Sequence, residues 1–249
     1  MQSSSSNDSS DYTKLVDLDH VWNIFHNKYV FGANDPALSR DKIELVIAHT
    51  IRLGDRCWYV VRVRSKNPPI IQHKPVSLRE TRYALEGPAG LGKSTLLGRW
   101  AGGDLAELRK GPYHLLCGMT EEFANHRRYL RASAAGSAPI VDRDDWLSST
   151  VYCAYYTGAM FLYDDPHLVL FPRLSSDYDT IVVDDPNLTD EALHQRIVER
   201  GSFDSHMPLS YTTITRIFFK LAAKHYNLMT MTMERARLFI DTLRDEEVE

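Results

Sequence analysis

The segment from Glu86 to Thr95 limits what this chain can fold into more than any other part of the sequence. It is Glu-Gly-Pro-Ala-Gly-Leu-Gly-Lys-Ser-Thr, which contains the pattern G-x-x-x-x-G-K-[ST] with one further glycine inside it. Residues 81–86 have the composition of a short strand, and the apolar residues within 96–100 can begin a helix. Between a strand and a helix, this pattern predicts a loop that binds phosphate groups. The alternative is a glycine-rich turn that matches the pattern by accident.

The predicted loop supplies its groups to ATP and Mg²⁺. Its glycines let successive backbone N–H groups turn toward one point, where the N-terminus of the following helix adds partial positive charge. We expect Lys93 to lie over the β- and γ-phosphates and the Ser94 hydroxyl to ligate Mg²⁺. The predicted cofactor-binding residues of the loop are Gly87, Gly90, Gly92, Lys93, Ser94 and Thr95.

Composition excludes some classes of function. The 249 residues are 43% hydrophobic and 25% charged, which suits one large soluble domain or a domain with an extension. The net charge of −4 gives no general basic surface, so nucleic acid is not an expected partner. The chain lacks both an apolar run of about 18 residues and an apolar segment at its start. We therefore expect no membrane span and no signal peptide, and a cytoplasmic or nuclear protein.

The cysteines give a weaker prediction. Cys57, Cys117 and Cys153 are an odd number and lack the spacing of metal ligands. Reduced, buried thiols of an intracellular protein are one interpretation, and an oxidised bridge between molecules is the other.

The sequence predicts two parts. Residues 1–80 form an N-terminal extension, in which a serine-rich head (1–10) is followed by apolar patterns that predict helices at 15–30 and 42–53 and a short strand at 57–63. Residues 81–249 form the second part, a domain built around the phosphate loop.

Strands and helices alternate after the loop. The predicted strands are 113–119, 139–144 and 180–183, and the predicted helices are 146–160, 189–200, 210–226 and 233–243. Such alternation around a phosphate loop predicts an α/β fold, with a parallel sheet between layers of helices as in P-loop kinases. Helices dominate the prediction overall.

The order of motifs resembles the herpesvirus-type thymidine kinases and related deoxynucleoside kinases. The pieces that carry the resemblance are the loop 87–95, Asp142-Arg143 after a buried strand, Tyr152 in the next helix, Gly158-Ala159-Met160, the segment 196–200, and Asp204 with Met207 before the Ser210 helix. The loop is specific and the Asp-Arg pair moderately so, whereas the other pieces count only as an ordered set.

The resemblance implies roles for individual residues. Arg143 would steady the phosphoryl group near the 5′ end of a nucleoside, and Tyr152 would stack on a pyrimidine, with Asp142 in the same substrate site. Arg196 and Arg200 would belong to a mobile lid over the phosphates. Each residue also has a structural interpretation. Arg143 could form an ion pair with a neighbouring aspartate, and Tyr152 could be an aromatic residue of the core. Arg196 and Arg200 could belong to a solvated helix face.

The catalytic base is expected just after the strand 113–119. Glu121 and Glu122 stand there, and we interpret Glu121 as the group that accepts the 5′-hydroxyl proton. A solvated pair of acids is the alternative. Only residues 122–141 separate Glu121 from Asp142, whereas the family carries a much longer segment that encloses the nucleoside. The acceptor site is therefore open or rebuilt from elsewhere, for example from the N-terminal extension.

Two hypotheses follow from these observations. The first is an ATP-dependent kinase of a pyrimidine deoxynucleoside, with Lys93, Glu121 and Arg143 as catalytic residues. The second is a catalytically silent viral structural protein derived from such a kinase, which self-assembles through its N-terminal extension, as an occlusion-body or lattice protein does. A regulatory module that binds nucleotide without catalysis lies between them.

Overall fold

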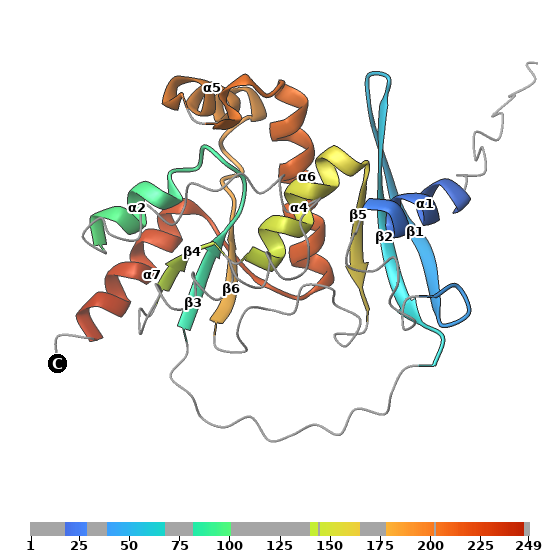
Figure 1. Ribbon diagram of the computed structural model, residues 1–249. Helices are drawn as coiled ribbons and strands as arrows, with labels where there is room; N and C mark the ends of the chain where they lie inside the picture. Colours follow the sequence, from blue (N-terminus) through green and yellow to red (C-terminus); the bar gives the residue numbers. More distant parts are fainter. Residues whose placement is uncertain are drawn as a thin grey trace, which may run out of the picture.

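A computed structural model describes residues 18–28, 39–67, 82–100, 140–143, 145–164, 178–201 and 203–246 (Figure 1). The helices are α1 (Leu18–Lys28), α2 (Lys93–Trp100), α4 (Asp145–Thr157), α5 (Asp190–Arg200), the short 3₁₀ helix η5 (Phe203–His206), α6 (Leu209–His225) and α7 (Met233–Glu246). The strands are β1 (Ile43–Leu53), β2 (Arg56–Ser65), β3 (Arg82–Glu86), β4 (Ile140–Asp142), β5 (Ala159–Tyr163), β6 (Tyr178–Val183) and β7 (Met229–Met231).

Four of these strands form a parallel sheet, sheet B, in the order β4-β3-β6-β7. The strand that precedes the glycine-rich loop, β3, lies between β4 and β6, with Leu85 opposite both Asp142 and Ile181. Because parallel strands end at one edge, the residues that follow β3, β4 and β6 meet there. The predicted α/β class with a parallel sheet is confirmed.

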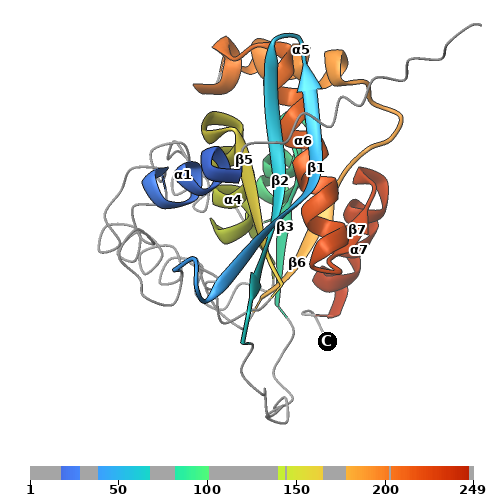
Figure 2. The same cartoon turned by 90° about the vertical axis from the view of Figure 1, so that its right-hand side faces the viewer.

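The other three strands form sheet A, in the order β1-β2-β5. β1 and β2 are an antiparallel hairpin, and β2 pairs in parallel with β5, with Tyr59 opposite Ala159 and Val63 opposite Tyr163. The N-terminal hairpin is therefore hydrogen-bonded to a strand that follows α4 in the sequence. In Figure 2, β1 and β2 lie in front and α4 and α6 behind them.

The main hydrophobic core lies between the two sheets, where α4 and α6 stand (Figure 1). Its largest fully buried side chains come from α1, β2, α4, β5 and α6: Phe25, Trp58, Tyr155, Phe161, Phe218 and Phe219. Burial of each large apolar side chain contributes about 1.5–3 kcal/mol to folding. The β1–β2 hairpin and sheet B thus share one hydrophobic core, to which α4 and α6 contribute side chains.

A second, smaller core lies on the opposite face of sheet B. It joins Leu97 of α2, Ile240 of α7, and Ile181 and Val183 of β6. Val182, between those two β6 residues, belongs to the main core instead. Side chains alternate between the faces of a strand, so β6 contacts helices on both sides.

The predicted helix at 42–53 is wrong, because this segment is strand β1. Its apolar residues satisfy helical spacing, but Ile43, Leu45 and Ile47 also alternate, and the first two of these are buried. Gly54, with a φ of 58°, turns the chain into β2, which supplies the hydrogen bonds of β1. The spacing of apolar residues in this segment is compatible with a helix and with a strand, and pairing with β2 makes it a strand.

Other predicted elements agree closely with the structure. Helices at 189–200, 210–226 and 233–243 are α5, α6 and α7, and the strand at 180–183 is the end of β6. The Thr189 hydroxyl caps α5 by accepting a hydrogen bond from the Ala192 N–H at 3.2 Å. The helix predicted at 146–160 ends earlier, at Thr157, because Gly158 takes a φ of 84° and strand β5 begins.

Two predicted features lie outside the described residues, namely the serine-rich head and the strand at 113–119. Over the part of the chain that the structure describes, no helix is long and apolar enough to cross a membrane.

Candidate functional site

The glycine-rich loop joins β3 to α2 at the carboxyl edge of sheet B. Gly87, Gly90 and Gly92 have φ angles of 132°, 84° and 91°, which L side chains rarely adopt. The loop conformation therefore favours glycine at each of these three positions. The strand–loop–helix setting predicted from the sequence is present.

One side of the loop packs closely against its neighbours. A Cβ atom at Gly87 would lie 2.2 Å from the backbone oxygen of Val183, at the end of β6. At Gly90 it would lie 2.7 Å from the backbone oxygen of Leu193, in α5. At Gly92 it would meet no atom within 4 Å. The loop thus rests on β6 and α5 and is open beside Gly92.

Lys93 is the first residue of α2 and directly follows Gly92, the position beside which the loop is open. Its side chain is buried, with an exposed fraction of 4%, and Nζ donates hydrogen bonds to the carbonyl oxygens of Gly87 (2.9 Å) and Pro88 (2.7 Å). The ammonium group therefore lies on the carbonyls of its own loop. Ser94 is half-buried and Thr95 is exposed. A hydroxyl at the start of a helix, next to an open backbone turn, fits a magnesium nucleotide.

A buried carboxylate stands beside the loop. Glu86, the last residue of β3, is fully buried, and its two carboxylate oxygens lie 2.8 and 2.9 Å from the Ser148 hydroxyl, which donates to them. Arg143 Nη1 lies 3.5 Å from the same carboxylate and donates to the Ser148 oxygen at 3.1 Å. Opposite charge and hydrogen bonds offset the cost of burying Glu86.

Arg143 itself has a strained backbone. Its φ is 74°, in the left-handed region, and its N–H donates to the Leu85 carbonyl at 3.0 Å. Such a conformation costs about 1–3 kcal/mol and is concentrated at functional sites. The guanidinium Nη1 of Arg143 also donates to the Tyr152 hydroxyl at 3.0 Å.

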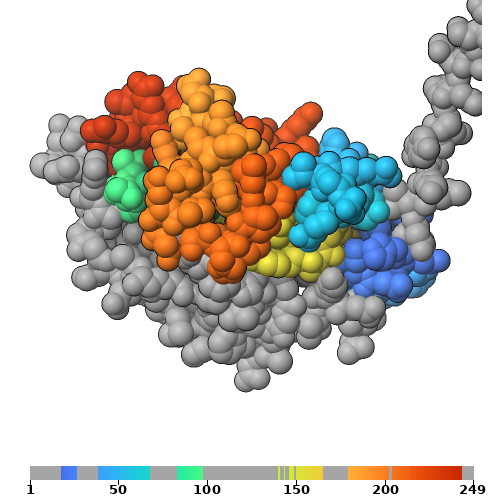
Figure 3. Space-filling model, turned by 90° about the horizontal axis from the view of Figure 1, so that it is seen from above, coloured from blue at the N-terminus to red at the C-terminus, as the bar shows by residue number. Residues whose placement is uncertain are grey.

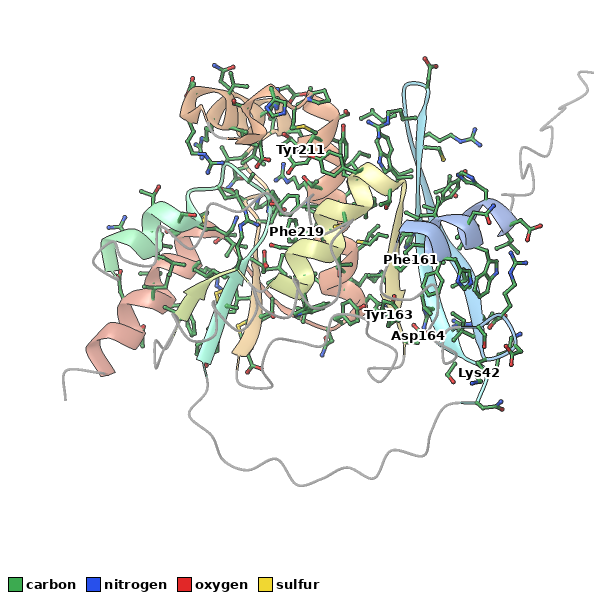
Figure 4. The ribbon with its side chains drawn as sticks, in the orientation of Figure 1. Lys42, Phe161, Tyr163, Asp164, Tyr211 and Phe219 are labelled. Carbon is green, nitrogen blue, oxygen red and sulfur yellow. The ribbon has the colours of Figure 1, made fainter. Side chains whose placement is uncertain are left out.

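Tyr152 lies in a cluster of aromatic rings. Its ring stacks on Tyr211 at a centroid distance of 5.9 Å and meets Phe219 edge-on, while the Arg143 guanidinium lies over it at 5.2 Å. Figure 4 shows the labelled Tyr211 and Phe219, both on α6. Burial raises the pKa of both Tyr152 and Tyr211 far above the usual value, so both hydroxyls stay protonated.

The N-terminal hairpin reaches this cluster. The Arg56 guanidinium lies over the rings of Trp58 and Tyr155 at 4.7 and 5.0 Å. The Tyr155 ring in turn packs edge-on against Tyr211 at 5.0 Å, and its hydroxyl is hydrogen-bonded to Ser210 at 3.1 Å. Seen from above, the hairpin tip (cyan), the α4–β5 segment (yellow) and the segment from α5 to α6 (orange) are neighbours (Figure 3).

The structure brings together many, but not all, of the predicted site residues. The loop residues and Arg143 follow β3 and β4 at the carboxyl edge of sheet B, where Asp142 is the last residue of β4. Tyr152 belongs to α4 and is joined to this edge by its hydrogen bond with Arg143. Arg196 and Arg200 are exposed on α5, the helix that packs on the loop through Leu193. Glu121 lies outside the described residues.

Sequence reasoning missed Glu86, Ser148 and Tyr211 as members of the site. Glu86 belongs to the predicted segment, but no local pattern links it to Ser148, which is 62 residues away. A polar residue that directly follows a buried strand, next to a phosphate loop, is the feature that could have drawn attention to Glu86.

Groups of possible metal ligands and the cysteines complete the description of the candidate site. Within the described ranges, no three His, Cys, Asp or Glu side chains are grouped as metal ligands. Cys57 is a free thiol and Cys153 is disulfide-bonded, so the interpretation as reduced thiols is wrong for Cys153. Cys117 lies outside the described residues.

Comparison with known proteins adds no relative. No protein-family description, curated protein or solved structure matches this chain. The case for a function rests on the geometry of the site.

Proposed function

We propose that the chain is a P-loop kinase-like protein that binds ATP with Mg²⁺ and transfers the γ-phosphoryl group to a nucleoside inside the cell. The observation that carries this proposal is the loop itself. Gly87, Gly90 and Gly92 all hold left-handed conformations between a parallel strand and a helix, and the space beside Gly92 is open next to Lys93. Backbone N–H groups in such a turn form an anion-binding site.

The loop residues bind and orient the phosphoryl donor. Bound ATP and Mg²⁺ supply the transferable group and the charge that neutralises the phosphate oxygens. The Ser94 hydroxyl would hold the metal, and Lys93 would exchange the carbonyls of Gly87 and Pro88 for phosphate oxygens. That exchange keeps the ammonium group hydrogen-bonded throughout, so its cost is small.

Arg143 is the residue best placed to steady the phosphoryl group. Glu86 and Ser148 hold its guanidinium at the sheet edge, 3.5 and 3.1 Å from their oxygen atoms. A positive charge at this position stabilises charge that develops on the equatorial oxygens during transfer. We retain Glu121 as the proposed base.

Tyr152 would take part in the acceptor site. Its ring is covered by Tyr211 and by the Arg143 guanidinium. A nucleoside base can stack on the Tyr152 ring only if the Arg143 guanidinium moves off that ring. The donor phosphates would favour this movement, because they form stronger, charge-assisted hydrogen bonds with the guanidinium. Asp142 and the lid arginines Arg196 and Arg200 complete the proposed set.

A second candidate function is a kinase-derived viral structural protein that self-assembles. Two observations favour it. The Lys93 ammonium is buried on loop carbonyls, and the Tyr152 ring is covered. Both groups are thus engaged within the chain. In this case the loop is a relic, and the N-terminal extension serves self-assembly rather than the acceptor site.

Titration calorimetry separates the candidates. ATP·Mg²⁺ is titrated into the folded protein, and thymidine follows in the same cell. Heat from both steps supports the kinase, and heat from ATP alone supports a regulatory module that binds nucleotide. Absence of both heats refutes nucleotide binding, and size measurement by light scattering then tests self-assembly.

Lys93→Ala provides the matched test of the loop. We expect it to abolish turnover and to weaken ATP binding by on the order of a hundredfold, as a lost charge-assisted contact of about 3 kcal/mol does. Lys42→Ala, at an exposed position before β1 (Figure 4), is the control and should bind ATP as the unaltered chain does. Unchanged turnover in Lys93→Ala would contradict the assignment of this segment as a phosphate-binding loop.

A further inference from the structure

One buried arginine, outside the residues discussed so far, holds the connection between β6 and α5. Arg216 of α6 has an exposed fraction of 7%. Its Nε donates to Asp184 Oδ1 at 2.8 Å, and its Nη2 donates to the Asp185 carbonyl at 2.6 Å. Its Nη1 donates to the Leu188 carbonyl at 2.7 Å and to Asp190 Oδ1 at 2.9 Å. All three nitrogens of the guanidinium therefore bind residues 184–190.

Both ends of this connection touch the phosphate loop. Just before it, the Val183 carbonyl oxygen lies 2.2 Å from the position that a Cβ at Gly87 would take. Just after it, the Leu193 carbonyl lies 2.7 Å from the corresponding position at Gly90. The loop packs against both carbonyls, so the distance between them affects the conformation of the loop. Arg216 spans the residues that determine that separation.

We propose that Arg216 is a positioning residue of the phosphate loop, which it holds in its binding conformation through the connection 184–190. The inference rests on the proposed function, because it assigns Arg216 a role toward the same nucleotide. Arg216 contacts neither Gly87 nor Gly90, so its effect passes through the backbone of β6 and α5.

The chemistry of the guanidinium suits this role. Its planar fork presents several donors in fixed directions, so it defines the relative positions of two carboxylates and two carbonyls at once. A lysine at the same place offers one ammonium group on a flexible stem and cannot fix four acceptors. A neighbouring residue, Lys220, forms an ion pair with Asp184 Oδ2 at 3.1 Å and is largely exposed. Lys220 is therefore a matched control on the same helix.

Hydrogen exchange measured by mass spectrometry tests the inference without relying on activity. In Arg216→Lys, we expect amides of residues 87–95 to exchange about tenfold faster than in the unaltered chain, while amides of the β1–β2 hairpin keep their rates. Lys220→Met should leave both segments unchanged. If Arg216→Lys fails to fold, Asp190→Asn, which weakens one acceptor of the fork, gives the same comparison.

Nucleotide binding supplies the second readout. We expect Arg216→Lys to raise the KM for ATP about tenfold and to leave the KM for thymidine unchanged. Unchanged loop exchange together with unchanged ATP affinity overturns the inference. So does an equal acceleration at every amide, since that indicates general loss of stability. If the unaltered chain binds no ATP, the proposed function fails, and loop exchange still decides the role of Arg216.

Discussion

Alanine substitutions at Gly90 and Gly92 form a matched pair that tests how the phosphate loop is held. The two residues have nearly the same φ, 84° and 91°, so the alanine backbone is strained similarly at both. They differ in their surroundings. A Cβ at Gly90 would stand 2.7 Å from the Leu193 backbone oxygen and 3.2 Å from Ile197 Cγ1, whereas a Cβ at Gly92 would meet nothing within 4 Å.

The difference can be estimated from these contacts. A left-handed alanine costs about 1–2 kcal/mol at either position. Overpacking against a backbone atom adds about 1–3 kcal/mol at Gly90 alone. The entropy that alanine removes from the unfolded chain is common to both variants and cancels. We therefore expect the free energy of unfolding to fall by about 1–3 kcal/mol more in Gly90→Ala than in Gly92→Ala.

Urea unfolding followed by circular dichroism measures this difference. With an m-value of about 1–3 kcal/mol per molar urea, a 2 kcal/mol gap separates the two midpoints by about 1 M. ATP binding should show the opposite order. The methyl group of Gly92→Ala enters the open side of the loop and should weaken ATP binding by on the order of tenfold or more. Equal midpoints for the two variants would refute the packing of α5 on the loop.

Two further predictions concern buried and paired polar groups. Ser148→Ala leaves the Glu86 carboxylate without its hydroxyl donor and should lower the free energy of unfolding by about 1–3 kcal/mol in urea, whereas Ser210→Ala, in a less buried pair, should cost less. Burial alone would raise the pKa of Asp164 (Figure 4), but hydrogen bonds from two arginines of β2 outweigh it and lower that pKa. Its stabilising contribution is therefore present above the unfolded pKa of about 3.9 and is lost as pH falls through the lower folded value. Thermal unfolding of Asp164→Asn should vary less with pH in that acid range, and identical pH profiles would contradict the ion pairing.

Only part of the candidate site could be predicted before the structure. The loop 87–95 was predicted correctly in place and setting, and Arg143 and Tyr152 are joined by a hydrogen bond. Their partners could not be predicted, because Glu86 and Ser148 are far apart in the sequence and no period connects them. The direction of Lys93, toward its own loop carbonyls, also depends on packing rather than on the motif.

The sequence by itself determined the features that local backbone chemistry governs. Glycines at 87, 90 and 92 permit left-handed turns, and amphipathic periods define α5, α6 and α7. Tertiary structure alone decided the features that depend on distant partners. Segment 42–53 satisfied both helical and strand spacing, and only pairing with β2, and of β2 with β5, made it a strand. Hydrogen bonds between strands are satisfied by residues elsewhere in the chain, so a local pattern cannot specify them.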